Sequence, residues 1–134
     1  MPTTWQYATL VSMTFTDPAT LIFLLLCGHA LGDFALQNEW VATNKDRSAR
    51  LRYPPEQRAK MQVIWPYLLT AHSLHHGLLV FLITQRLSLG LAETAVHWIS
   101  DFAKCEKWYG FHGDQAMHIA SKFVWVGLIV GHYV

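Results

Sequence analysis

Histidine and aspartate recur at helical spacing in segments of this sequence that are otherwise apolar. Residues four apart lie on one face of a helix, one turn above another. Imidazole nitrogens and carboxylate oxygens are the usual protein ligands of Zn²⁺, and also of Mn²⁺ or Fe²⁺. The pattern therefore predicts a divalent metal site, for Zn or Mn/Fe, built from several helices. The predicted ligands are His29, Asp33, His72, His76, His97, Asp101 and His118.

Four charged residues continue the polar faces of these helices, which we call polar stripes, and they suggest catalysis. A metal ion with an open position holds a water molecule of lowered pKa, which is a nucleophile at neutral pH. We expect Glu93 or Asp114 to handle protons beside such a water. We expect Lys104 or Lys122 to neutralise a phosphate or another developing anion. A second interpretation of Asp114, as a helix N-cap, stays open.

The remaining histidines and the short motifs narrow the chemistry. His75 lies about 100° around the helix from the predicted ligand His76. We therefore expect His75 to contact the metal ligands and not the metal itself. His112 and His132 are predicted at solvent or interface positions. The spacing of the second histidine pair fits the zincin motif, but Ser73 replaces its glutamate, which excludes that class. No Gly-rich phosphate loop or Gly-x-Ser-x-Gly elbow occurs in the sequence.

Composition indicates where these polar residues lie. Apolar residues make up 52% of the chain and charged residues only 14%, against about 25% charged in a typical soluble domain. Mean hydropathy is nevertheless only +0.20, because polar residues, eight of them histidine, interrupt the apolar runs. The composition predicts a chain embedded in membrane lipid. A net charge of +1 provides no basic field for nucleic acid.

The predicted fold is all-α: a single domain over residues 1–134, forming a polytopic bundle of about four transmembrane helices. Each expected span is close to the roughly 20 residues that a bilayer requires. Asp17-Pro18 is a suitable helix start, with Asp as the N-cap. Residues 1–16 are predicted to be a short interfacial segment, and residues 41–60 a polar loop that holds six of the ten Lys and Arg. The predicted spans are residues 18–40, 65–84, 87–104 and 114–134.

The charge distribution predicts an orientation in a bacterial, or phage-infected, inner membrane. Basic loops stay in the cytoplasm, which places residues 41–60 inside and both termini outside. All four polar stripes then meet at one level, on the cytoplasmic side of the midplane. A soluble helical bundle is the alternative that stays open.

A short repeat links the first and third predicted spans. Residues 29–35 and 97–103 both read H-x-x-x-D-F-A. The two copies lie on helices that would run in the same direction. A duplicated helix pair, related by an axis along the membrane normal, is one explanation, and coincidence is the other.

The motifs together resemble a known family. They are Gly28-His29-x-x-Gly32-Asp33-Phe34-x-x-Gln37, His72-x-x-x-His76, His97-x-x-x-Asp101-x-x-Lys104 and Asp114-Gln115-x-x-His118. Over about residues 20–125 the sequence resembles the domain of unknown function 3307, a family of small bacterial and phage membrane proteins. The resemblance implies a multi-helix inner-membrane protein with shared His, Asp and Gln positions, and it implies no activity. The basic 41–60 segment is longer than is usual in the family, and we expect it to contact anionic lipid.

These observations lead to three functional hypotheses. The first is a membrane-embedded, metal-dependent hydrolase that acts near the cytoplasmic leaflet on a lipid-linked or anionic substrate. The second is a small ion or proton transporter that uses the His and Asp residues as a relay and would form a homo-oligomer. The third is a phage-type accessory protein that binds a host membrane protein, with a purely structural polar stripe.

Overall fold

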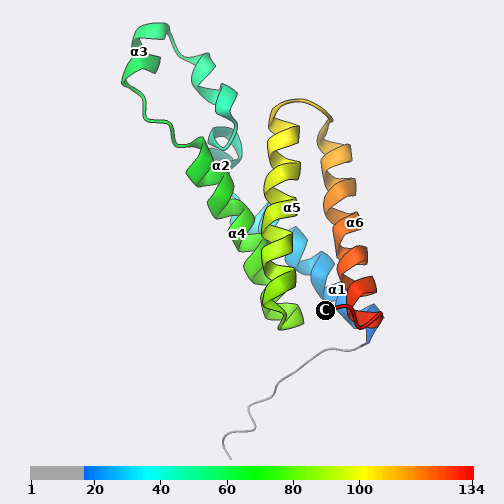
Figure 1. Ribbon diagram of the computed structural model, residues 1–134. Helices are drawn as coiled ribbons and strands as arrows, with labels where there is room; N and C mark the ends of the chain where they lie inside the picture. The colour runs from blue at the N-terminus through cyan, green and yellow to red at the C-terminus, as the bar shows by residue number, and fades with distance from the viewer. Residues whose placement is uncertain (1–16) are drawn as a thin grey trace, which may run out of the picture.

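Residues 17–134 are described by the computed structural model, and they form helices connected by short segments, without any strand (Figure 1). The expected all-α class is therefore confirmed for this part of the chain. The predicted interfacial segment, residues 1–16, lies outside the described residues. The long helices are α1 (Pro18–Ala30), α4 (Trp65–Thr84), α5 (Leu87–Cys105) and α6 (Phe111–Val130).

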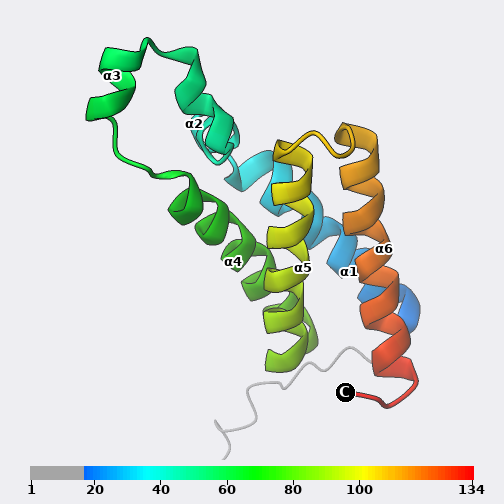
Figure 2. The ribbon, with the colours of Figure 1, turned by 45° about the horizontal axis from the view of Figure 1, so that its top comes forward.

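The four long helices form a ring in which each contacts two neighbours. Helix α1 packs against α4 and α6, and α5 packs against the same two helices (Figure 2). Helices α4 and α5 approach most closely, because two glycines meet where they cross. A Cβ atom on Gly77 would lie only 2.5 Å from the carbonyl oxygen of Gly90. The ring leaves an interior that all four helices line.

The start and end of α1 follow from local chemistry. The side chain of Asp17 caps the helix by accepting a hydrogen bond from the backbone N–H of Thr20 at 2.8 Å. The backbone and side-chain hydrogen bonds from Thr20 hold the pKa of Asp17 below its usual value. The helix continues as a π-helical segment, η1 (Leu31–Leu36), and then stops at extended Gln37. The predicted helix over residues 18–40 thus ends four residues early.

The predicted polar loop contains three short helices instead. These are α2 (Glu39–Asn44), the 3₁₀ segment η2 (Arg47–Arg52) and α3 (Pro55–Lys60). We call residues 39–60 the arm, since it projects from one end of the ring (Figure 1). Two ion pairs attach it to α5 and the residue after α5: Lys45 binds Asp101, and Arg47 binds Glu106.

Apolar and polar side chains are distributed in an unusual way. A small apolar cluster, which includes Leu21, Val80 and Ile129, fills the end of the ring away from the arm. The remaining interior is lined mainly by buried polar and charged side chains. Many large apolar side chains point outward instead, among them Leu74, Leu78 and Leu82 of α4, Leu91 and Ile99 of α5, and Phe123 and Val124 of α6.

Two helical segments, Pro18–Leu36 and Trp65–Thr84, are long and apolar enough to cross a membrane by length and composition. Helices α5 and α6 do not meet the same requirement of length and apolar composition. The expectation of four spans is therefore met only in part by this measure. Helix α6 begins at Phe111, three residues before its predicted start.

Candidate metal centre

All seven predicted metal ligands lie inside the ring and are buried or nearly buried. They come from every long helix and from η1, as the helical spacing predicted. The structure brings six of them into two groups that could each hold a metal ion. The first group is Asp33, His72, His76 and His97, and the second is His97, Asp101 and His118.

In the first group, three imidazole nitrogens converge on one carboxylate oxygen. Oδ1 of Asp33 lies 3.1 Å from Nε2 of His76, 3.4 Å from Nε2 of His72 and 3.8 Å from Nε2 of His97. The Nε2 atoms of His72 and His97 are 3.1 Å apart. A tetrahedral ion with bonds of about 2.0 Å requires its ligand atoms to be about 3.3 Å apart. The residues present therefore fit a tetrahedral divalent ion.

The η1 segment explains how Asp33 reaches this position. A π-helical turn adds a residue to the turn and rotates the following side chains relative to an α-helix, and such turns are frequent at functional sites. Gly32 permits the approach of α4, because a Cβ atom there would lie 2.4 Å from the ring of His76. Gln115 then fixes the carboxylate by donating a hydrogen bond from Nε2 to Oδ2 of Asp33 at 2.7 Å.

In the second group a lysine already binds the only carboxylate. Oδ1 of Asp101 lies 3.6 Å from Nε2 of His118, and its Oδ2 binds the ammonium group of Lys45. Oδ1 of Asp114 lies 3.2 Å from the same imidazole nitrogen, while its Oδ2 accepts a hydrogen bond from Lys104 at 2.8 Å. His118 thus lies between two carboxylates that each have a lysine partner.

The four residues predicted for proton and anion handling pair with one another. Lys122 is 1% exposed, and its ammonium donates to Oε1 of Glu93 at 2.5 Å. Lys104 pairs with Asp114 in the same way. The structure places neither Lys122 nor Glu93 free to meet a substrate, and it places Lys104 with 30% of its side chain exposed.

One of the buried acidic side chains inside the ring has no lysine partner among the described residues. Four acids, Asp33, Glu93, Asp101 and Asp114, are each 9% exposed or less. Three of them have a lysine partner. Among residues 17–134, Asp33 is contacted by histidines and by Gln115, but by no lysine or arginine. A buried carboxylate without a cation is costly, so the charge pattern favours a metal ion beside Asp33.

Unsatisfied polar atoms occur in the same region. Nε2 of His76 and both ring nitrogens of His118 are buried without a well-aligned hydrogen bond in the described part of the chain, although Nε2 of His76 lies 3.1 Å from Asp33 and Nε2 of His118 lies 3.2 Å from Asp114. A metal ion would satisfy the nitrogen of His76, because that atom belongs to the first group.

Two predicted residues support the ligands. His29 is in neither group; its Nε2 lies 3.1 Å from Oε1 of Gln115 and 3.6 Å from Asp33, so it helps to hold both side chains. Glu93 lies 3.6 Å from Nδ1 of His97, just beyond hydrogen-bond distance, at the position from which a carboxylate typically orients a ligating imidazole. Trp125 fixes Glu93 in turn through a 2.6 Å hydrogen bond from its indole nitrogen.

The structure decides three further expectations about single residues. His75 is exposed on the outer side of α4 and does not support the site. Asp114 is not an N-cap, since Gly110 holds that position and Asp114 is buried in the first turn of α6. His112 and His132 are exposed, as expected.

Burial raises the pKa of Cys105 to about 11, which keeps this thiol protonated near neutral pH.

Sequence reasoning missed the roles of Lys45 and Gln115. Lys45 belongs to the segment that was expected to be a polar loop, yet it is 4% exposed and binds Asp101. The available signal was its position as the first basic residue of the chain, close to the end of the first helix. Gln115 belongs to one of the family motifs, but only the structure shows that it joins Asp33 to His29.

The fold and the site define an all-helical protein with buried His and Asp groups that could hold a metal ion. The chain belongs to the family described as protein of unknown function (DUF3307), which matches residues 21–132. The family suggested by the sequence motifs is thus confirmed. No curated protein and no solved structure matches the chain.

Proposed function

We propose that this protein is a membrane-embedded metalloprotein that acts as a metal-dependent hydrolase near the cytoplasmic leaflet. One observation carries the metal centre. Nitrogens of His72, His76 and His97 converge on Asp33, the one enclosed acid without a lysine or arginine partner among the described residues. An ion with an open position would supply a water molecule of lowered pKa at this point.

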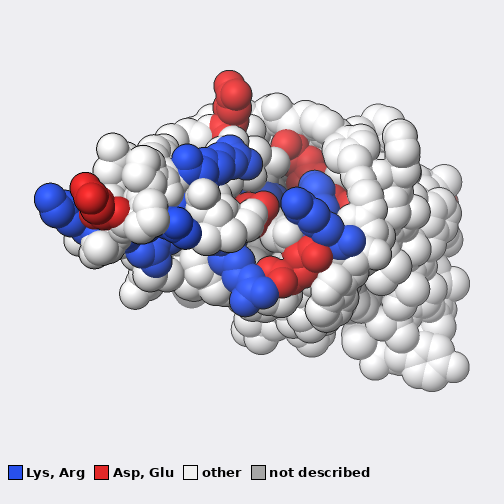
Figure 3. Space-filling model, turned by 90° about the horizontal axis from the view of Figure 1, so that it is seen from above, with Lys and Arg blue, Asp and Glu red and all other residues white. Residues whose placement is uncertain are grey.

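Membrane insertion is supported by the reversed distribution of side chains. The interior is polar and the outer surfaces of the helices are apolar. Only 28% of the apolar window in Pro18–Leu36 and 39% of that in Trp65–Thr84 is buried, whereas the core helix of a soluble protein is mostly buried. The charged residues gather on the arm end of the molecule (Figure 3). That end would face the cytoplasm.

Hydrolysis is supported by the groups beside the centre. His118 lies between Asp101 and Asp114, and its ring stacks on that of His97 with centroids 4.0 Å apart. We therefore assign proton handling to His118 in place of Glu93, which Lys122 and Trp125 occupy. A substrate in the inner leaflet would approach from the arm end, where Lys104 is partly exposed.

The test is the metal content of protein purified without a histidine tag, measured by inductively coupled plasma mass spectrometry. We expect about one Zn, Mn or Fe ion per chain, loss of that ion in His76→Ala, and full retention in His75→Ala. The two residues are adjacent on α4, but only His76 faces the interior. No metal after reconstitution with Zn²⁺ and Mn²⁺, or equal metal in both variants, would refute the proposal.

A proton relay is the second candidate, and one observation favours it. A row of neighbouring ionisable groups crosses the interior, from Lys122 and Glu93 through His97 and His118 to Asp114 and Lys104. Proton flux into liposomes by metal-free protein, with no substrate turnover, would favour this function over hydrolysis.

A further inference from the structure

A pocket of about 290 Å³ lies where the arm meets the end of α5. It lies next to the candidate metal centre, because two of its lysines bind buried acids of the ring interior. Lys45 binds Asp101, whose Oδ2 is 3.4 Å from Nε2 of His72, and Lys104 binds Asp114. The lining residues include Gln37, Lys45, Asp46, Arg52, Lys104 and Cys105.

The pocket provides many hydrogen-bond donors for an anion. An ammonium group has three N–H donors, and Lys45 and Lys104 each give one to a carboxylate. The guanidinium of Arg52 forms no ion pair or hydrogen bond within residues 17–134. The nearby carboxylate of Asp46 is used locally, since it caps η2 by accepting a hydrogen bond from the N–H of Ser48.

Charge decides how strongly an anion binds. The three cations that line the pocket, Lys45, Arg52 and Lys104, are balanced by Asp46, Asp101 and Asp114. Asp33 adds a further carboxylate to the surroundings, so the metal-free protein attracts an anion less strongly here. A divalent ion at Asp33 adds two positive charges beside the pocket, which strengthens the attraction for an anion.

We propose that this pocket binds the phosphate group of the substrate, and that it does so more tightly in the metal-loaded protein. The proposal rests on the metal centre described above and adds the substrate class. A volume near 290 Å³ is just below the roughly 300–1,000 Å³ typical of ligand pockets. It accommodates a phosphate headgroup, while any acyl chain would stay in the lipid.

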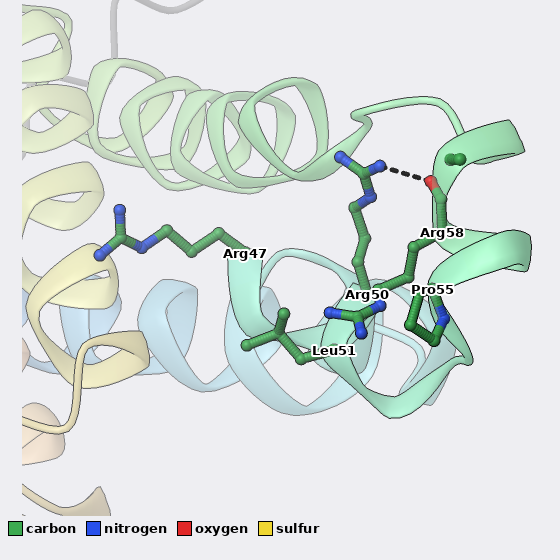
Figure 4. A pocket seen from close by; sticks show the side chains of 6 residues that line it. Arg47, Arg50, Leu51, Pro55 and Arg58 are labelled. Carbon is green, nitrogen blue, oxygen red and sulfur yellow. Dashed lines mark hydrogen bonds between the residues drawn. The ribbon is translucent and has the colours of Figure 1, made fainter.

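A larger pocket in the arm is less suitable, although three arginines line it. It measures about 530 Å³ (Figure 4). Its guanidinium groups do not converge: Arg47 extends away from the other two and pairs with Glu106, and Arg50 donates to the carbonyl oxygen of Arg58 at 2.7 Å. Arg58 therefore provides a control, as an arginine of the same arm that lines a different pocket.

The test is equilibrium dialysis of the full-length protein in detergent with radiolabelled inorganic phosphate, with metal content measured on the same samples. We expect binding to metal-loaded protein and at least tenfold weaker binding after chelation. Arg52→Gln should weaken binding about tenfold without loss of metal, since it removes charge-assisted hydrogen bonds but touches no candidate ligand. Arg58→Gln should bind like the wild type.

The outcomes separate the two proposals. Metal-loaded protein that binds no phosphate, or equal effects of Arg52→Gln and Arg58→Gln, would overturn the phosphate pocket and leave the metal centre intact. Protein that takes up no metal would overturn the proposed function, and unchanged phosphate binding after chelation would overturn the coupling. Competition by phosphatidic acid micelles but not by glycerol phosphate would identify a lipid phosphate as the ligand. Competition by both compounds would show that the pocket also accepts a soluble phosphate.

Discussion

Replacing Asp33 by asparagine should change the stability of the protein differently with and without bound metal. Asparagine has nearly the same shape as aspartate but carries no charge. In metal-free protein, Asp33 is an enclosed carboxylate with no lysine or arginine partner within residues 17–134. Removing its charge should therefore leave the free energy of unfolding unchanged or raise it. In metal-loaded protein the same substitution removes a ligand and with it the stabilisation that the ion provides.

The size of the effect follows from linkage. An ion present at 100 times its Kd stabilises the folded state by about 2.7 kcal/mol. For a chain of this length that corresponds to a rise in Tm of roughly 10 °C, at about 4 °C per kcal/mol. Asp33→Asn should lose this increment, because the asparagine side chain is a neutral and much weaker ligand.

Thermal unfolding in detergent, with and without a chelator, measures both effects. The wild type should lose about 10 °C on chelation, and Asp33→Asn should lose almost nothing. Asp101→Asn provides the contrast, since it leaves buried Lys45 without its partner and should cost about 3–5 kcal/mol in both conditions. An equal fall in Tm for Asp33→Asn with and without metal would show that Asp33 is only a structural hydrogen-bond acceptor.

Three further predictions concern packing, charge and orientation. Lys122→Met should cost about 3–5 kcal/mol by leaving Glu93 charged and buried, and adding Glu93→Gln should recover most of that loss; chemical denaturation would show whether it does. Gly77→Ala should destabilise the protein by more than 1 kcal/mol, because its Cβ meets α5, whereas Gly127→Ala, which meets nothing, should stabilise it by about 0.5–1 kcal/mol; similar effects in the two variants would contradict the close helix contact. A cysteine at Lys60 should react with a membrane-impermeant maleimide only in inverted inner-membrane vesicles, and reaction in intact spheroplasts would reverse the proposed orientation.

The family, the all-α class and the shared helical faces could be predicted from the sequence. His97 and Asp101 are one helical turn apart, so the backbone alone places them on one side of α5. The same argument holds for the two histidines of α4. Helix periodicity is local, which is why this information survives in a single sequence.

The pairing of charges could not be predicted in the same way. The sequence favoured Glu93 and Lys122 as free catalytic groups, and the structure joins them to each other. Which acid meets which lysine depends on how far each helix is rotated about its axis. A change of one residue in register turns a side chain by about 100°, and many weak contacts between helices set that rotation.

By itself, the sequence determined which residues share a face of each helix and that the polar stripes are too regular to be surface decoration. Only the tertiary structure decided that Asp33 is the enclosed acid with no lysine or arginine partner in the described chain, and that Lys45 enters the site from the arm. The η1 turn shows the physical reason. Its extra residue changes the direction of Asp33, and the packing of His76 over Gly32 holds that arrangement in place.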